Sequence, residues 1–292
     1  WVLRALQRSR WEWCYSASNV AGIPSLCPAA RRLCGRSLPR PAARAPGRPA
    51  LRAKQKRRPE KGQRGDERRG DARQGHTAKS HALQRLRLTG GECRGRPVTA
   101  PAAFLRPMMS RVREALFSML DSTGVISPSG SMLDLYSGSG IVGLEALSRG
   151  MGHVTFVDYS PACSKTIASN CRELGFGERS RMVKRRVEVL LAHPEKLDIQ
   201  CPFQLVTVTP PYEEVNYTKL VDSLVASPVL GEDSLAVIEY PAELGNLPPT
   251  LANGSLVGCR NRDYGRTVLA LYVCRPSGKL ALEPRQDEFG AS

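Results

Sequence analysis

Two prolines and a tyrosine follow directly on an apolar run in the stretch QLVTVTPPYEEV, residues 204–215. Each proline fixes its own φ angle, so the backbone carbonyl beside the Pro-Pro step is held in one direction. A carbonyl acceptor aimed at an exocyclic base amine orients the lone pair of that amine, and the ring of Tyr212 can stack on an extruded base. Pro210, Pro211 and Tyr212 are therefore candidate catalytic residues, with a plain loop stop as the alternative.

A glycine-rich loop, Gly138-Ser139-Gly140-Ile141-Val142-Gly143, stands between a strand pattern and a helix pattern. Glycines let a ligand approach the backbone, and the N-terminus of the following helix offers free N–H groups. Dehydrogenases, methyltransferases and structural turns all use glycine in this way, so the loop alone does not decide between them.

Two carboxylates make the ligand more specific. Asp134 stands just before the end of the first strand, where it suits a cationic ammonium and would repel a pyrophosphate; the alternative is that it bonds to N–H groups of the turn. Asp158 ends the second strand, a position where an acid commonly accepts both hydroxyls of a ribose. An ammonium, a ribose and a close backbone describe S-adenosylmethionine better than NAD.

Strand and helix patterns alternate along the part of the chain that holds these residues. They predict an α/β fold, a Rossmann-like doubly wound parallel sheet whose C-terminal strands form an antiparallel hairpin at one edge. The loops after residues 136, 158 and 208 then open on one crevice, because ligands bind outside the carboxyl ends of such strands. The predicted strands are 131–136, 153–158, 181–187, 203–208, 234–240, 255–262 and 267–274, and the clearest helices are 110–122, with Ser110 as its N-cap, and 161–174.

Residues 83–101 alternate apolar and basic side chains around Gly90-Gly91, which predicts a β-hairpin with arginines on one face. Arg94 and Arg96 are two of these arginines, and the family resemblance given below implies that they contact RNA phosphates.

Positive charge is concentrated at the start of the chain. Residues 1–80 carry 20 Lys and Arg against 5 Asp and Glu, whereas residues 81–292 carry 23 against 22. This leader is rich in Arg, Ala, Pro and Gly and poor in large apolar residues, so we expect it to be disordered. An Arg-rich, acid-poor leader is typical of an organelle transit peptide; a basic arm that binds RNA is the alternative. Because the chain begins at Trp1, we expect that further residues precede it.

The remaining composition excludes other classes of site. Nine cysteines occur without a C-x-x-C pair and four histidines without metal-ligand spacing, so neither a zinc site nor a disulfide framework is expected. No run of about 18 apolar residues predicts a membrane span.

The stretches RPMMSRVREALFSML, MLDLYSGSGIVGLEALSRG and TPPY resemble, in this order and spacing, the RsmD family of bacterial small-subunit rRNA guanine-N2 methyltransferases. The hairpin GGECRGRPV and the closing YGRTVLALY extend the resemblance over residues 84–275. The resemblance implies a class I methyltransferase that uses S-adenosylmethionine and methylates the exocyclic N2 amine of a guanine in 16S-type rRNA, with no metal. The implied partner is rRNA or a small-subunit assembly particle, and the protein is expected to be a monomer.

The resemblance also implies roles for individual residues. Thr209 to Tyr212 occupy the catalytic tetrapeptide, in which the family has Asp or Asn where this chain has Thr209; Met108-Met109 likewise replace more polar residues. The residues implied to surround the cofactor are Asp134, Ser137, Gly138 and Gly140 for the methionine part, Asp158 for the ribose, Tyr159 for the adenine, and Arg106 and Arg111 for the covering motif.

Together these observations predict a leader at 1–80, an RNA-contacting hairpin at 81–105, a methyltransferase domain at 106–276 and a tail at 277–292. The leader on a bacterial-type rRNA enzyme suggests the chloroplast stroma, with the mitochondrion as the alternative. Two other functions stay open: a non-catalytic RNA-binding assembly factor, which Thr209 favours, and an NAD oxidoreductase, in which Asp134 and the Pro-Pro-Tyr step would have no role.

Overall fold

The computed structural model describes residues 86–102, 105–213, 215–280 and 282–290. The leader predicted at residues 1–80 lies outside these ranges, as does the beginning of the predicted hairpin segment.

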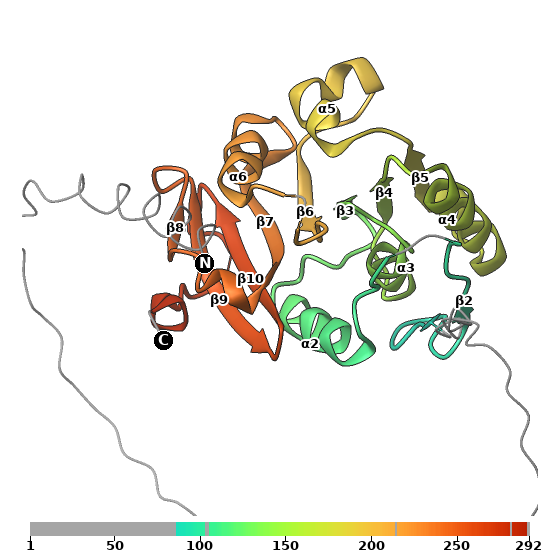
Figure 1. Cartoon of the computed structure of the whole chain (residues 1–292), viewed down its shortest axis with the longest axis horizontal. Helices are drawn as coiled ribbons and strands as arrows, with labels where there is room; N and C mark the ends of the chain where they lie inside the picture. The colour runs from blue at the N-terminus through green and yellow to red at the C-terminus, as the bar shows by residue number, and fades with distance from the viewer. Residues whose placement is uncertain (1–85, 103–104, 214, 281, 291–292) are drawn as a thin grey trace, which may run out of the picture. The chain divides into compact units, whose positions relative to one another are not determined.

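An eight-stranded sheet forms the centre of the described chain, in the order β5-β4-β3-β6-β7-β10-β9-β8 (Figure 1). The five strands from β5 to β7 in this order run parallel, and β10 is antiparallel to both of its neighbours. The predicted doubly wound sheet with an antiparallel hairpin edge is confirmed, and the short β8 extends that edge by one more strand. The strands are β3 (Ser131–Leu135), β4 (His153–Val157), β5 (Ser180–Val183), β6 (Phe203–Val208), β7 (Leu230–Pro241), β8 (Thr250–Leu251), β9 (Leu256–Tyr264) and β10 (Thr267–Cys274).

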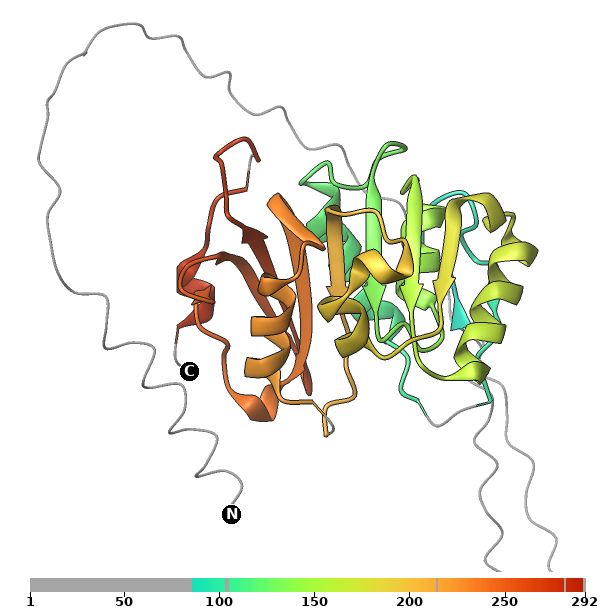
Figure 2. The same ribbon diagram turned by 90° about the horizontal axis from the view of Figure 1, so that it is seen from above.

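Helices cover both faces of this sheet. Figures 1 and 2 show α5 and α6 on one face and α2, α3 and α4 on the other. The helices are α2 (Ser110–Asp121), α3 (Ile141–Ser148), α4 (Pro161–Leu174), α5 (Val187–Ala192) and α6 (Tyr217–Ala226), and the 3₁₀ turns are η2 (Gly177–Arg179), η3 (Pro194–Leu197), η4 (Ala242–Leu244) and η5 (Gln286–Phe289).

The start of α4 agrees with the capping residues in the sequence, whereas the start of α2 does not. α4 agrees with its predicted bounds because Ser160 caps its N-terminus, Pro161 opens it and Gly175, with a φ of +82°, ends it. Ser110 was expected to cap α2, but it is the first residue of that helix; Met109 takes the cap position and no side chain makes a capping bond. The strand predicted at 181–187 ends at Val183, because residue 187 already begins α5.

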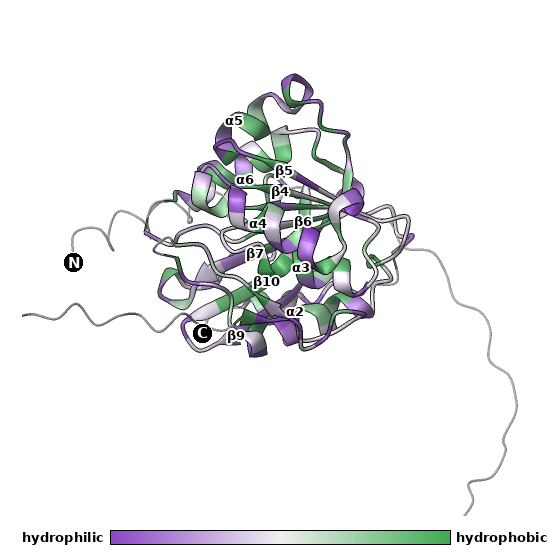
Figure 3. Cartoon of the chain, turned by 90° about the vertical axis from the view of Figure 1, so that its right-hand side faces the viewer, coloured by the Kyte–Doolittle hydropathy of each residue, from purple (hydrophilic) through white to green (hydrophobic). Residues whose placement is uncertain are grey.

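The core reaches the far ends of the described chain. β10 is buried along its whole length and is among the hydrophobic segments in Figure 3. Phe289, in the predicted C-terminal tail, is also buried, with its ring centre 5.3 Å from that of Tyr272. In the described part of the chain no helix has the length and apolar character needed to cross a membrane.

The predicted hairpin is present but short. β1 (Leu86–Arg87) pairs antiparallel with β2 (Pro97–Val98), and residues 88–96 connect them.

Candidate active site

Three loops meet at the carboxyl edge of the parallel strands. Leu135 of β3 is level with Val157 of β4 and with Val208 of β6, so the chain leaves all three strands at one height. The backbone N–H of Ser137 donates to the Val157 carbonyl at 3.0 Å, and that of Thr209 to the Leu135 carbonyl at 3.4 Å. The glycine loop, the Asp158 turn and the Thr-Pro-Pro-Tyr segment therefore adjoin one another, as the sequence pattern predicts.

The glycines of the loop serve different purposes. Gly138 has a φ of +54°, and a Cβ placed on it would meet no atom closer than 3.8 Å, so its missing side chain leaves open space. A Cβ on Gly140 would lie 2.8 Å from Ile167 of α4, and one on Gly143 only 2.3 Å from Phe156 of β4. Gly138 thus fits close approach of a ligand to the backbone, whereas the other two allow close packing of helices and strands.

Asp158 holds the glycine loop to the next turn. Its Oδ2 accepts from the Gly138 N–H at 2.9 Å and its Oδ1 from the Ser160 N–H at 2.8 Å. Each carboxylate oxygen has a second acceptor direction, so the pair still fits a ribose diol. Tyr159 beside it is 59% exposed, with the Arg186 guanidinium 5.3 Å from its ring centre, and fits a flat ring such as adenine.

Asp134 is buried, with only 1% of its surface exposed. Its Oδ1 accepts from the Thr207 hydroxyl at 2.7 Å and its Oδ2 from the Gly143 N–H at 3.3 Å. Burial raises the pKa of this carboxyl to about 7, against the hydrogen bonds that lower it. Asp134 therefore does bond to an N–H group of the glycine loop, as the structural alternative predicted. Its contact with a cationic ammonium stays a prediction.

Ser137 links two strands through its side chain. Its hydroxyl donates to the Asp134 carbonyl at 2.6 Å and accepts from the Val157 N–H at 2.9 Å. These bonds fix the start of the glycine loop, and a direct contact of Ser137 with a cofactor stays a prediction.

The Thr-Pro-Pro-Tyr segment leaves β6 at the same edge. The Thr209 hydroxyl donates to the carbonyls of Leu135 and Tyr136, at 3.4 Å in each case. Pro210 is buried and Pro211 is exposed, so the step begins in the core and ends at the surface.

Tyr212 is fixed by two residues that the sequence analysis did not single out. Its hydroxyl donates to Glu239 Oε1 at 2.6 Å and lies 3.0 Å from the Thr267 hydroxyl. Burial and the neighbouring Glu239 raise the pKa of Tyr212, so its phenol is neutral at physiological pH. The usable signal was the acid in the pattern SLAVIEY, since a carboxylate near the carboxyl end of a buried strand faces the crevice.

The two arginines expected to cover the cofactor lie in different surroundings. Arg106 lines a small hollow together with Met108, Met109, Glu239 and Thr267. Arg111 is exposed on α2 and makes no hydrogen bond or ion pair with any described residue. The structure thus brings Arg106 beside Tyr212's partners, and the covering role of Arg111 stays a prediction.

A buried carboxylate docks the hairpin onto the domain. Glu145 of α3 accepts from the N–H and the hydroxyl of Thr89, at 2.8 and 2.7 Å, from Arg149 at 2.9 Å and from Arg113 at 3.1 Å. Both Arg113 and Glu145 are 0% exposed. Burial alone would raise the pKa of Glu145, but the bonds from Thr89 and Arg149 and the charge of Arg113 bring it below its ordinary value.

The connection of the hairpin also lies directly on α3. The Ser148 carbonyl accepts from the Glu92 N–H at 2.7 Å, and the Ser148 hydroxyl donates to the Gly90 carbonyl at 2.7 Å. A Cβ on Gly91 would lie 1.8 Å from the Ser148 carbonyl oxygen, so only glycine fits there. The stretches TGG, RVREALF and GLEALSRG therefore meet in one buried network.

Arg94 and Arg96 are both exposed on the hairpin connection. Arg96 donates to the Glu173 carbonyl of α4 at 3.2 Å, whereas the Arg94 side chain has no partner among the described residues. Arg94 is thus the freer of the two for a phosphate.

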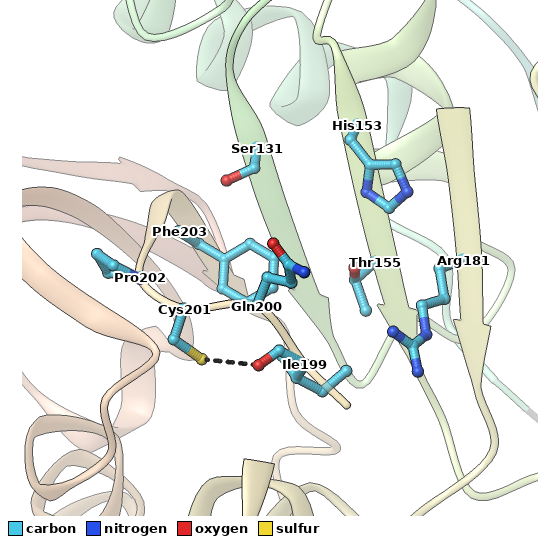
Figure 4. Close-up of a pocket in the computed structure, with 9 residues that line it drawn as sticks. All are labelled: Ser131, His153, Thr155, Arg181, Ile199, Gln200, Cys201, Pro202 and Phe203. Atoms are coloured by element: carbon cyan, nitrogen blue, oxygen red, sulfur yellow. Dashed lines mark hydrogen bonds between the residues drawn. The ribbon is translucent and has the colours of Figure 1, made fainter. Parts of the chain in front are cut away.

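A separate cavity of about 450 Å³ lies at the amino ends of the parallel strands, away from the loops described above. Figure 4 shows His153 and Thr155 of β4, Arg181 of β5 and the segment 199–203 around it. These residues stand at or near the amino ends of the parallel strands, so the cavity is distinct from the carboxyl-edge site.

Comparison with known proteins gives concordant results. The family model described as conserved hypothetical protein 95 matches residues 86–273. The chain is 33% identical over 191 residues to the "Putative rRNA methyltransferase YlbH" of Bacillus subtilis, an alignment that covers 65% of this chain and 100% of that protein. It is 32% identical over 196 residues to "Ribosomal RNA small subunit methyltransferase D" of Escherichia coli K12, with 67% and 93% covered.

A solved structure, the "Putative methyltransferase yhhF from Escherichia coli", superposes with a TM-score of 0.56 at 30% identity. The superposition covers 65% of this chain and 98% of that one. The chain therefore belongs to the RsmD family, described as conserved hypothetical protein 95, and has the class I methyltransferase fold.

Proposed function

We propose that this protein methylates the exocyclic N2 amine of a guanine in small-subunit rRNA, with S-adenosylmethionine as the methyl donor. The observation that carries the proposal is the meeting of the open Gly138 backbone, the Asp158 carboxylate and the Thr-Pro-Pro-Tyr segment at one edge of the sheet. Membership of a family whose members are named as rRNA methyltransferases supports it.

Each residue has a task that follows from its position. Gly138 lets the cofactor approach the backbone closely. Asp158 accepts hydrogen bonds from the ribose hydroxyls, and Tyr159 lies against the adenine. When bound, S-adenosylmethionine supplies an electrophilic methyl group on a sulfonium. The carbonyl beside Pro210 and the Thr209 oxygen hold the hydrogens of the target amine, which aims its lone pair, while Tyr212 stacks on the base.

The decisive experiment is single-turnover transfer of a labelled methyl group to small-subunit rRNA, followed by mass spectrometry of the nucleosides. We expect N2-methylguanosine. Asp158→Ala should weaken S-adenosylhomocysteine binding by about 1–3 kcal/mol, the usual loss for charge-assisted hydrogen bonds. Calorimetry with NAD is the control for the oxidoreductase alternative; binding of NAD in place of S-adenosylhomocysteine would contradict the proposal.

A non-catalytic assembly factor is the second candidate, because Thr209 stands where the family has Asp or Asn. We expect Thr209→Asn to transfer methyl groups at the native rate or faster, and Thr209→Ala to be slower by about tenfold or less. Tyr212→Ala should be slower still, because the stacking on the base is lost. A native protein that binds cofactor and RNA but transfers nothing, together with an active Thr209→Asn variant, would establish the assembly factor instead.

We also propose that the protein acts in the chloroplast stroma, with the mitochondrion as the alternative. The support is the Arg-rich composition of residues 1–80, which carry 20 basic against 5 acidic residues. Residues 1–80 fused to a fluorescent protein should direct it to the plastid, and a cytosolic or nuclear signal would contradict a transit peptide.

A further inference from the structure

Glu239 of β7 is a half-buried carboxylate beside the catalytic segment to which the proposed mechanism gives no task. We infer that Glu239 reads the Watson–Crick edge of the target guanine by accepting a hydrogen bond from N1–H, next to the N2 amine that the catalytic segment holds. This inference rests on the proposed function and names the residue that selects guanine within the same site.

The register of the sheet places Glu239 at the reacting edge. β6 and β7 are parallel, and Val208, the last residue of β6, pairs with Ile238, so Thr209 and Glu239 each follow directly on this last pair. A base amine held by the Thr209 oxygen and the backbone carbonyl beside Pro210 therefore has the Glu239 carboxylate on the adjacent strand.

Hydrogen bonding leaves one oxygen of this carboxylate for a ligand. Oε1 accepts from the Tyr212 hydroxyl at 2.6 Å, which fixes the orientation of the side chain. No hydrogen bond to Oε2 is found among the described residues, so this oxygen keeps its acceptor capacity. Both partners of the Tyr212 hydroxyl, Glu239 and Thr267, line the hollow that also contains Arg106.

The acceptor of Glu239 and the donors of Arg106 match the Watson–Crick edge of guanine. Guanine presents two adjacent donors, N1–H and the N2 amine, next to the O6 acceptor, whereas adenine has an acceptor at N1. The free oxygen of the carboxylate accepts from N1–H, the catalytic segment accepts from the N2 amine, and an arginine such as Arg106 donates to O6. The other common bases do not offer two adjacent donors on this edge.

The charges around Glu239 strengthen this recognition. Burial raises the pKa of Glu239, while the Tyr212 hydrogen bond and the positive charge of Arg106 lower it. A carboxylate in such a partly dehydrated place makes stronger hydrogen bonds than one in water, and an N1 acceptor facing it would be repelled.

A purely structural role, in which Glu239 only fixes Tyr212, is the competing explanation. Glu239→Gln separates the two, because the amide oxygen still accepts from the Tyr212 hydroxyl while the amide N–H₂ now faces the base. Glu232→Gln is the matched control, since Glu232 is an exposed acid at the other end of the same strand.

The test uses the full chain and rRNA fragments that carry at the target position either guanine or 2-aminopurine, which keeps the N2 amine but has an acceptor at N1 and no O6; the contribution of O6 is the same in every variant compared. We expect the native protein and Glu232→Gln to prefer guanine strongly. Glu239→Gln should reduce the rate of methyl transfer to guanine by about tenfold or more and should reduce the preference for guanine over 2-aminopurine. Its S-adenosylhomocysteine affinity and thermal midpoint should stay unchanged.

Three results would overturn the inference. An unchanged preference in Glu239→Gln would assign Glu239 to fixing Tyr212 alone. Equal rates of the native protein on guanine and 2-aminopurine would do the same without any variant, which keeps the test valid if Glu239→Gln does not fold. No transfer by the native protein to either RNA would instead contradict the proposed function itself.

Discussion

Replacing Asp134 by asparagine should remove a large part of the pH dependence of stability. The Asp134 carboxyl is buried against Thr207 and Gly143, and burial raises its pKa from 3.8 to about 7. Asparagine has nearly the same shape, and its amide oxygen can accept from the Thr207 hydroxyl, but it carries no titratable proton.

The magnitude follows from the shift. A difference of about 3 pH units, at about 1.4 kcal/mol each, is a free energy of about 4 kcal/mol. Because the folded pKa of Asp134 is raised, its contribution is fully present below the unfolded pKa and is lost as pH rises through the folded pKa. Most of this loss, about 3 kcal/mol, falls between pH 5 and pH 8. Losing the Gly143 bond costs Asp134→Asn about 1 kcal/mol at every pH.

Urea unfolding of both proteins between pH 5 and pH 8 measures the effect. The native protein should lose stability relative to Asp134→Asn by about 3 kcal/mol over this range. Asp233→Asn is the control: hydrogen bonds from Ser277 lower the pKa of exposed Asp233, so its contribution is lost as pH falls. If the ammonium of S-adenosylhomocysteine approaches Asp134, a saturating concentration of it should move the pH range of this stability loss to lower pH. A stability difference that is constant within about 1 kcal/mol would refute the reasoning.

Three further predictions address the hairpin and the glycine loop. Arg113→Ala should lower the free energy of unfolding by about 3–5 kcal/mol, because it breaks a fully buried ion pair and leaves Arg149 as the one arginine on Glu145 among the described residues; a loss below about 1 kcal/mol in urea unfolding would contradict this. Arg94→Glu should weaken rRNA binding and flatten its salt dependence more than Arg96→Glu, since Arg96 already bonds to a helix carbonyl; filter binding across a salt series decides. Gly140→Ala should lower the thermal midpoint more than Gly95→Ala, because both have left-handed φ angles but only the former meets a neighbour, at 2.8 Å.

The elements that the sequence predicted best are those with local signals at both ends. β6 was predicted at 203–208 and is found there, because an apolar run is bounded by two proline steps. The meeting of Asp158 with the glycine loop was predicted from the strand ends alone, since parallel strands leave a sheet at one edge.

The burial of charged residues by distant partners could not be predicted from local sequence patterns. Arg113 lies among the helical apolar positions of α2 and would be expected at the surface, yet it is 0% exposed because Glu145 and the carbonyls of Arg87 and Met108 accept from it. The available signal was Glu145 itself, a single charge in the otherwise uncharged α3 that needs several donors once buried. Arg149 lies only four residues from Glu145, but Arg113 and Thr89 lie 32 and 56 residues away, so no local pattern identifies these two.

The structure gives Thr209 a property that its residue type alone does not. A free hydroxyl can turn its proton toward a ligand and would then compete with the target amine as a donor. The Thr209 hydroxyl instead directs its proton toward the carbonyls of Leu135 and Tyr136, both at 3.4 Å, at the end of the neighbouring strand. With the proton on either carbonyl, the oxygen of Thr209 keeps lone pairs that can accept from the target amine, as an oxygen of Asp or Asn would. The departure from the family pattern at Thr209 keeps the acceptor and changes its strength, which is the physical reason to expect a slower methyltransferase rather than an inactive one.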